Sequence, residues 1–342
     1  MKKLFTLSML FVATALFAQE ETEKKLTLSG SVDAYYQTYL TAPDNVEQSF
    51  GTSFADQTGF SLGMANIIVS YEGEKTGAVA DLAFGSRGIG AVGGDYDISP
   101  FNDVIPGDRE FYVNQLYAYW NVSESTTLTL GRFNTFLGYE VISPVANFNY
   151  STSYLFSNGP FSHVGLKADF ALSDDFSLML AVMNPTDVNN NLTGGYAFGA
   201  QLGYAGQFLN LYYDDEEVLG FEIDYTGGFD LTDSFFLGIN GAYQTSNDAG
   251  FYGAALYPQL AASDAFSVGL RGEYFSLHAK NVDDLPSVLA LTLTGSYAVE
   301  NLTIKPEVRL DSWSNSMPYI KDSQGTLSDN LAAFTLAAIY SF

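Results

Sequence analysis

A two-residue periodicity is the feature of this chain that most limits its fold. Between residues 26 and 40, apolar side chains such as Leu28 and Val32 alternate with polar ones such as Ser29 and Asp33. A period of two is typical of a β-strand that has one apolar and one wet face. Because the same pattern recurs up to residue 342, the sequence predicts an all-β chain.

Sixteen segments carry this pattern, and the connections between them alternate in length. The predicted strands are residues 26–41, 60–73, 76–86, 111–122, 126–133, 162–172, 176–184, 194–205, 207–214, 219–230, 235–246, 249–261, 265–277, 287–299, 302–312 and 331–342. Short turns alternate with the other connections, and every long connection falls on the same side. The turn at Gly206 has the weakest turn chemistry. This alternation predicts an antiparallel up-and-down transmembrane β-barrel of about sixteen strands.

A soluble sandwich would show similar alternation, so the period alone leaves both folds open. The polar faces favour the barrel, because residues 302–311 place a row of ionisable side chains on one face, where they suit a water-filled lumen better than lipid. The alternative is a solvated outer face of a soluble sheet. The expected lumen charges are Asp33, Asp81, Lys167, Asp169, Glu222, Asp224, Arg271, Glu273, Lys305, Glu307, Arg309 and Asp311.

Aromatic residues beside the short turns favour a membrane boundary, where rings are commonly found. On the apolar parity these are Tyr71, Trp120, Phe170, Phe176, Phe229, Phe235, Phe266 and Tyr297. The final strand ends on Phe342, with Phe334, Leu336 and Tyr340 on the same face. This ending resembles the signal that the barrel-assembly machinery recognises in outer-membrane barrels, so that machinery is an expected partner.

Three residues disturb the pattern. Pro258 and Pro306 lie inside predicted strands, where the missing N–H predicts a bulge. Arg132 has the parity of the apolar residues Leu128 and Leu130. We therefore expect the chain to begin turning inward before Arg132.

The first residues predict export. Lys2 and Lys3 precede an apolar run from Leu4 to Phe17, which is typical of a cleavable signal peptide, residues 1–18. An N-terminal membrane anchor is the alternative, although the run is short for a helix that spans a bilayer. Residues 19–25 predict a short periplasmic tail before the barrel, residues 26–342. The predicted location is the outer membrane of a Gram-negative cell, where lipid and lipopolysaccharide would contact the barrel.

Composition limits the chemistry. The chain has no cysteine and two histidines, which excludes thiolate and His-rich metal sites, and neither a metal nor a cofactor is predicted. A formal net charge of −25 argues against a nucleic-acid partner. Ser276 and His278 lie two apart on one face, near Asp283 and Asp284. No activating motif accompanies them, so we predict no enzyme activity.

Residues 214–217 form an acidic run of two aspartates and two glutamates. Carboxylate oxygens of this kind could hold Ca²⁺ or bridge divalent ions to lipopolysaccharide. The alternative, which we favour, is a solvated charge run at the tip of a loop.

The connection from Asn134 to Phe161 has the composition of a packed segment. It holds seven aromatic residues and a single charge, Glu140. An exposed loop of this length would be polar, and a structureless connection beyond about 12–15 residues is usually functional or disordered. Because aromatic richness argues against disorder, we predict that this third extracellular loop folds into the barrel.

This part of the chain also resembles a known family. Residues 131–168 look like the signature of the putative β-barrel porin-2 family of outer-membrane proteins, common in Bacteroidetes. The resemblance rests on Gly131, Arg132, Phe133, Gly138, Tyr139, Glu140, Asn149, Tyr150, Ser151, Gly159, Pro160, Phe161, His163 and Gly165. It implies an outer-membrane barrel that acts as a porin, with no substrate assigned to the family as a whole.

A sixteen-stranded barrel is wide enough to hold an aqueous channel, which the third loop would narrow. We expect Phe136, Tyr139, Phe148 and Tyr154 to pack the loop onto the wall, and His163 to bond it from the lumen side. The predicted constriction residues are Glu140, Asn147, Asn149 and Tyr150. The alternative is a lid over the mouth that never narrows the pore.

The sequence therefore predicts a porin for passive diffusion of small hydrophilic solutes. Among the expected lumen charges acids outnumber bases, which predicts a modest cation preference. The alternative is a non-conducting or gated barrel that binds a ligand or surface partner through its long loops. A homo-oligomer is compatible with either function.

Overall fold

The computed structural model describes residues 25–44, 49–92, 113–191, 193–215 and 218–342. The predicted signal peptide and nearly all of the predicted tail lie outside these residues. Within the described ranges, no helix is long and apolar enough to cross a membrane.

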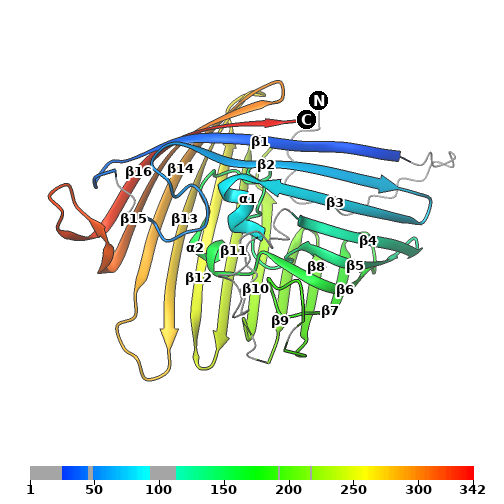
Figure 1. The fold of residues 1–342 in the computed structure, drawn as a ribbon. Helices are drawn as coiled ribbons and strands as arrows, with labels where there is room; N and C mark the ends of the chain where they lie inside the picture. Colours follow the sequence, from blue (N-terminus) through cyan, green and yellow to red (C-terminus); the bar gives the residue numbers. More distant parts are fainter. Residues whose placement is uncertain (1–24, 45–48, 93–112, 192, 216–217) are drawn as a thin grey trace, which may run out of the picture.

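The described chain forms sixteen strands and two short helices (Figure 1). The strands are β1 (Lys25–Tyr39), β2 (Gly59–Glu72), β3 (Thr76–Phe84), β4 (Val113–Ser123), β5 (Thr126–Asn134), β6 (Ser162–Ala171), β7 (Phe176–Met183), β8 (Ala197–Tyr204), β9 (Gln207–Tyr213), β10 (Phe221–Asp230), β11 (Phe235–Ser246), β12 (Ala249–Ala261), β13 (Phe266–Ala279), β14 (Ser287–Val299), β15 (Leu302–Lys321) and β16 (Leu327–Ser341). The helices are α1 (Gly85–Val92) and α2 (Tyr154–Asn158).

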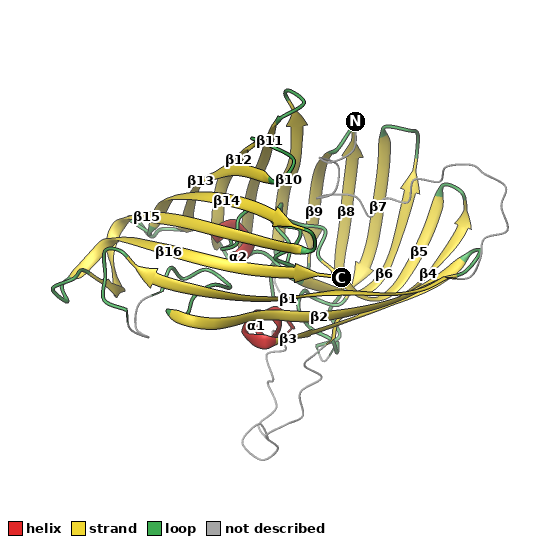
Figure 2. Ribbon diagram, turned by 90° about the horizontal axis from the view of Figure 1, so that it is seen from above, coloured by secondary structure: helices red, strands yellow, loops and turns green. Residues whose placement is uncertain are grey.

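Each strand pairs with its neighbours in sequence, and β1 pairs with β16 to close the barrel. The closing pair is antiparallel and runs from Ser31, opposite Ser341, to Tyr39, opposite Ala333. Figure 2 shows the strands following one another around the ring. Closure leaves no strand edge unpaired, which a membrane requires. The predicted antiparallel sixteen-stranded barrel is thus confirmed.

The hairpin at Gly206 is one of the short turns. Tyr204 pairs with Gln207, and the two residues between them, Ala205 and Gly206, have φ angles of 48° and 80°. Two central residues with positive φ match the twist of the flanking strands in a tight hairpin. The weak turn signal therefore marks a real hairpin.

Two expectations about the strands are wrong. The predicted loop at 313–330 is mostly strand, because β15 and β16 extend to a turn of residues 322–326. The predicted bulges at Pro258 and Pro306 are also absent, since Pro258 pairs with Leu237 and Pro306 with Leu336 without a register shift there. A residue in a central strand donates its N–H to only one neighbour, so each proline removes a single bond of the ladder.

The outer and inner faces of the wall differ sharply in exposure. Leu130 and Leu293 point outward and are 63% and 52% exposed, whereas their neighbours Thr129 and Thr294 point inward and are 4% and 0% exposed. Six of the eight predicted boundary aromatics are exposed, and Phe170 and Phe235 are half-buried. The barrel therefore carries an apolar outer surface far larger than a soluble monomer exposes.

Candidate functional site: the segment inside the barrel

The connection between β5 and β6, residues 135–161, lies inside the barrel and is called the insert below. It begins and ends at one point of the wall, since Thr135 donates its N–H to the Phe161 carbonyl at 3.0 Å. Between these residues it contacts the inner faces of strands all around the ring, from Asp33 on β1 to Asp224 on β10 and Glu307 on β15. Only a segment within the lumen can make all of these contacts.

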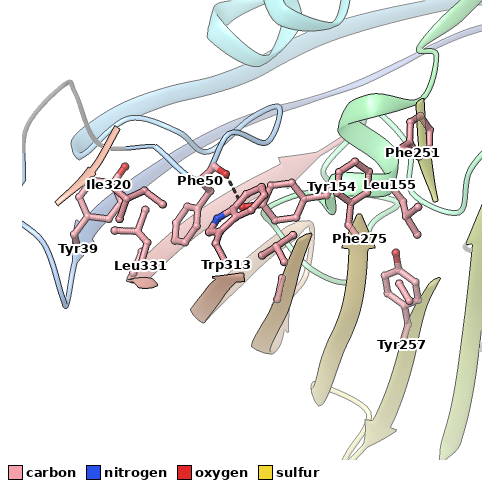
Figure 3. Packing of buried hydrophobic residues seen from close by; sticks show 14 residues of the cluster. Tyr39, Phe50, Tyr154, Leu155, Phe251, Tyr257, Phe275, Trp313, Ile320 and Leu331 are labelled. Atoms are coloured by element: carbon pink, nitrogen blue, oxygen red, sulfur yellow. Dashed lines mark hydrogen bonds between the residues drawn. The ribbon is translucent and has the colours of Figure 1, made fainter. Parts of the chain in front are cut away.

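Every buried apolar cluster of the described residues includes a residue of the insert. Leu137 packs with β5, β7, β8 and β9, Ile142 with β2, β3 and α1, and Tyr150 with β1 and β16. Tyr154 lies between Trp313 and Phe275, with ring centroids 5.1 and 5.7 Å away (Figure 3). The insert is therefore the centre of the core.

Three glycines of the wall leave space for aromatic rings of the insert. A Cβ on Gly199 would lie 2.6 Å from the Phe136 ring, one on Gly269 2.5 Å from the Phe148 ring, and one on Gly238 2.2 Å from the Tyr139 hydroxyl. A side chain at any of these positions would force the facing ring to shift. Together with Tyr154, these are the four rings expected to pack the loop onto the wall.

A buried ion pair joins the insert to β13. Arg271 has no exposed surface, and its Nη1 donates to Glu140 Oε1 at 2.6 Å and to the Ser151 carbonyl at 2.6 Å. The other Glu140 oxygen accepts the Ser153 N–H at 2.7 Å. Because both charges are paired and bonded, burial of the ion pair does not leave an uncompensated charge.

Two wall glutamates each bind consecutive backbone N–H groups of the insert. Glu307 accepts from Tyr150 and Ser151 at 2.8 and 3.0 Å. Glu273 accepts from Tyr154 and Leu155 at 3.0 and 2.8 Å, at the beginning of α2. Hydrogen bonds to a carboxylate are stronger than neutral ones. The wall acids thus fix the backbone of the insert.

Basic residues of the wall bind the opposite backbone groups. Lys305 Nζ donates to the carbonyls of Pro144 and Asn147. Arg309 donates to the Thr152 carbonyl at 3.1 Å and pairs with Asp311 at 2.7 Å. The charged side chains of β15 that the sequence singled out therefore bind the insert.

Tyr150 anchors the insert on the side of β1. Its hydroxyl donates to Asp33 Oδ2 at 2.5 Å, and its carbonyl accepts from Arg87 of α1 at 3.1 Å. Burial, and next the charge of Asp33, raise the pKa of the Tyr150 phenol. The hydroxyl consequently remains a donor at any physiological pH.

The four predicted constriction residues face protein instead of a channel. Glu140, Asn147, Asn149 and Tyr150 are all buried, with 1–7% of their surface exposed. Asn147 bonds both backbone groups of Val141, and Asn149 donates to Thr294 at 2.7 Å. Their assignment to the pore lining is therefore corrected: they fasten the insert, because their polar atoms are already paired.

The expected lumen charges all lie on inward-facing positions, but most are covered. Ten are buried: Asp33, Asp81, Glu222, Asp224, Arg271, Glu273, Lys305, Glu307, Arg309 and Asp311. Only the side chains of Lys167 and Asp169 are partly exposed, at 26% and 40%, and they pair with each other at 2.7 Å. The expected excess of free acids in the lumen is wrong for these residues, since ten of the twelve are buried.

The family-motif residues lie at the two ends of the insert. Gly131 has a φ of +139°, and Arg132 after it is buried, with its Nε donating to the Asn114 carbonyl at 3.2 Å. His163 Nε2 lies 2.9 Å from Thr135 Oγ1, the expected bond to the loop. Phe133 and Pro160 are buried, Gly138, Tyr139, Gly159 and Phe161 are half-buried, and Gly138 has a φ of +83°.

Three functional residues escaped the sequence argument. Phe50 and Phe54, from the connection between β1 and β2, are buried in the clusters around the insert. Arg87 of α1 is 2% exposed and donates its Nε to the Ile142 carbonyl at 2.8 Å. Two aromatic residues in a connection expected to be polar were the available signal for the first pair. Arg87 offered none, because its hydrogen-bond partners are the backbone carbonyls of Ile142 and Tyr150.

The residues considered for catalysis or metal binding have other partners. Ser276 Oγ donates to the Leu277 carbonyl at 3.2 Å, and His278 Nε2 lies 2.8 Å from the Gln244 carbonyl. Asp214, which begins the acidic run, accepts the N–H groups of Val218 and Gly220 and closes its own turn. Glu216 and Glu217 lie outside the described residues.

Comparison with protein families gives a match over almost the whole chain. The model of the family described as putative beta-barrel porin-2, OmpL-like, matches residues 25–342. The chain belongs to this family. The resemblance seen in residues 131–168 thus extends to the complete barrel. No curated protein sequence matches this porin-2 family member.

Solved barrels share the fold of this porin-2 family member at low identity. The outer-membrane channel DcaP of Acinetobacter baumannii is 12% identical, with a TM-score of 0.59 over 94% of this chain and 99% of that one. A loop L8 deletion mutant of OmpT from Vibrio cholerae is 9% identical, with a TM-score of 0.55 over 93% and 99%. A trimer form of OmpT is also 9% identical, with a TM-score of 0.54 over 93% and 99%. These likenesses show the fold alone.

Proposed function

We propose that this chain is an outer-membrane porin through which small hydrophilic solutes diffuse passively. The observation that carries the proposal is a closed barrel whose outer face is apolar and exposed while its charged side chains lie on the inner face. Such a wall is stable in a bilayer and leaves a polar interior for water and solutes. Family membership agrees with this function.

The solute path runs beside β4, β5 and β6. On β13 to β16 the inward side chains at mid-height are buried by the insert, whereas Gln115, Tyr117, Lys167 and Asp169 on the opposite wall are half-buried. Near the short turns, inward side chains around the ring are small, polar and half-buried, including Ser29, Ser70, Thr127, Ser177, Ser267, Ser296 and Thr303. These residues form the vestibule to which the path leads.

The proposal includes a modest cation preference, which arises from acidic residues at the pore mouth and not from the charges inside the lumen. The paired Lys167 and Asp169 give the path no net charge. The short turns, however, carry exposed acids against Lys75: Glu74, Glu124, Asp174, Asp175, Asp233, Asp264 and Glu300. A ring of one sign at a pore mouth concentrates counter-ions. The acidic mouth therefore favours cations.

A gated barrel is the second candidate, and the density of bonds around the insert favours it. Ten charges that would otherwise line the lumen are buried beneath this segment and its neighbours. A segment held in this way can close the pore until a ligand or surface partner displaces it. The hydrogen bonds of the insert to Asp33, Asp224 and Glu307 on the inner wall favour this position over a lid across the mouth.

The location and partners follow from the proposed function. The short turns would face the periplasm, and lipid and lipopolysaccharide would contact the outer wall. Phe342, whose ring is 52% exposed and whose backbone pairs with Gly30, is available to the barrel-assembly machinery before closure. The proposal includes no catalytic step.

Single-channel recording tests the proposal. Because Thr135 and Phe161 are bonded neighbours, residues 136–160 can be replaced by a short Gly–Ser turn that keeps β5 and β6 paired. We expect stable conductance steps in the wild type, a cation bias in the reversal potential under a salt gradient, and larger steps after the replacement. A silent wild type that conducts only after the replacement would favour the gated barrel. Silence of both proteins, with refolding shown by gel mobility, would refute a channel.

A further inference from the structure

The outer wall has one region that breaks its apolar character. A cavity of about 530 Å³ lies where the ends of β12 to β15 adjoin the connection between β13 and β14. Its lining includes Tyr252, Tyr274, Ser276, His278, Asp283 and Asp284. Tyr252 and Tyr274 are 41% and 45% exposed and point outward. The cavity therefore opens on the outside of the barrel, away from the lumen.

The cavity lies directly above the apolar belt. Further along the same outward faces come Leu256 on β12, Leu270 on β13 and Leu289 on β14, which are 50%, 39% and 53% exposed. A molecule that occupies the cavity can thus extend an apolar chain along these leucines. This combination of a polar pocket and an apolar track fits a lipid, with the headgroup in the pocket.

The lining defines the chemistry of that headgroup. The carboxylates of Asp283 and Asp284 are exposed and make no hydrogen bond within the described part of the chain, and serines and tyrosines supply hydroxyl groups beside them. The lining has neither Lys nor Arg, and nearby Lys280 is paired with Asp248 at 2.8 Å. A phosphate would meet two like charges without a counter-charge, so a headgroup with a phosphodiester is disfavoured.

Aromatic rings add a second element of recognition. The rings of Tyr252 and Tyr274 lie 6.4 Å apart at 50°, and His278 stacks on Tyr243 at 5.1 Å. Rings present apolar faces to the C–H groups of a sugar, while carboxylates accept its hydroxyl protons. Both elements suit an uncharged molecule with many hydroxyl groups.

We propose that this cavity binds the saccharide headgroup of a glycolipid in the surrounding leaflet. The inference rests on the proposed membrane location and adds a lipid site on the outer wall. The site is separate from the pore, because its tyrosines Tyr252 and Tyr274 point outward and are exposed.

The test uses nanodiscs that contain phosphatidylethanolamine and monoglucosyl diacylglycerol with the same acyl chains in equal amounts, with a chelator present throughout. The barrel is released, and the lipids retained on it are identified by native mass spectrometry. Tyr274→Leu and Asp283→Ala are compared with Tyr213→Leu, which removes an outward tyrosine of β9 that is 46% exposed. Gel mobility without heating reports insertion of each barrel.

We expect the wild type and Tyr213→Leu to retain the glycolipid in preference to phosphatidylethanolamine. Loss of a ring contact or a carboxylate should lower that preference roughly fivefold or more. Equal retention of both lipids by inserted wild type, or an unchanged preference in both cavity variants, would overturn the inference. Preferred retention of phosphatidylethanolamine would also overturn it and indicate an ammonium site. A wild type that fails to insert would refute the proposed membrane location as well.

Discussion

Arg271→Met should release the insert without unfolding the barrel. Arg271 is fully buried and donates five hydrogen bonds, to Glu140 Oε1, the Ser151 carbonyl and hydroxyl, the Thr152 carbonyl and the Thr292 hydroxyl. Four of these bonds go to the insert. Methionine fills part of the volume but leaves the Glu140 carboxylate with the Ser153 N–H as its remaining bonded partner.

The magnitude follows from burial of the pair. Removal of one partner of a buried ion pair costs about 3–5 kcal/mol, because a charge remains without compensation. The substitution destabilises the docked state of the insert, because the Glu140 carboxylate is hydrated again when the insert leaves the wall. At about 1.4 kcal/mol per factor of ten, the undocked population should rise on the order of 10²- to 10³-fold.

Limited proteolysis measures that population. Chymotrypsin cleaves after aromatic residues, of which the insert contains many. Because the docked insert is buried, cleavage requires undocking, and the cleavage rate follows the undocked population. Lys280→Met is the matched control, because it breaks an ion pair of similar length, 2.8 Å, that is 64% exposed on both sides. Solvent and salt screen an exposed pair, so it contributes little, and the control should be cleaved at the wild-type rate.

The double variant Glu140→Gln with Arg271→Met separates charge from packing. Removal of both charges should restore part of the protection, because no unpaired carboxylate remains. If Arg271→Met were cleaved at the wild-type rate and conducted like the wild type, the ion pair would not hold the insert. The account of the docked state would then be wrong.

Two further predictions concern the packing of the insert and the proposed path. Gly238→Val should displace the insert at Tyr139, because even its Cβ would lie 2.2 Å from the Tyr139 hydroxyl, and faster chymotrypsin cleavage is expected. Gly241→Val is the control, because the nearest atom to its Cβ lies 3.8 Å away. It should be cleaved more slowly than Gly238→Val. Lys167→Glu should shift the reversal potential under a salt gradient toward cations, since Lys167 lies on the least covered wall; an unchanged potential would place the path elsewhere.

The strands themselves were predictable from the sequence. A period of two is a local property, because neighbouring side chains on a strand must point to opposite faces. The boundary between membrane and lumen imposes that period on every strand of a barrel. The predicted strands 235–246, 249–261 and 287–299 therefore coincide with β11, β12 and β14. The long ends of β15 and β16 escaped, because outside the apolar belt a strand needs no apolar face.

The partners of the charges could not be predicted in this way. Parity placed Glu273, Glu307 and Arg271 on the inner face, but it did not distinguish water from protein in front of them. Both glutamates bind backbone N–H groups of the insert, and Arg271 binds backbone carbonyls in addition to Glu140. Every residue type carries such backbone groups. A buried charge bound to backbone leaves no pattern in the sequence of its partner.

By itself, the sequence determined the barrel, its strand order and a packed connection between β5 and β6, because composition and alternation act within a few residues. Only the tertiary structure decided which wall residues hold this connection inside the barrel, that Phe50, Phe54 and Arg87 join it there, and that ten expected lumen charges are buried. The physical reason is that burial inside a closed barrel depends on contacts between residues far apart in the chain. Glu307 and Tyr150 are 157 positions apart and bond at 2.8 Å.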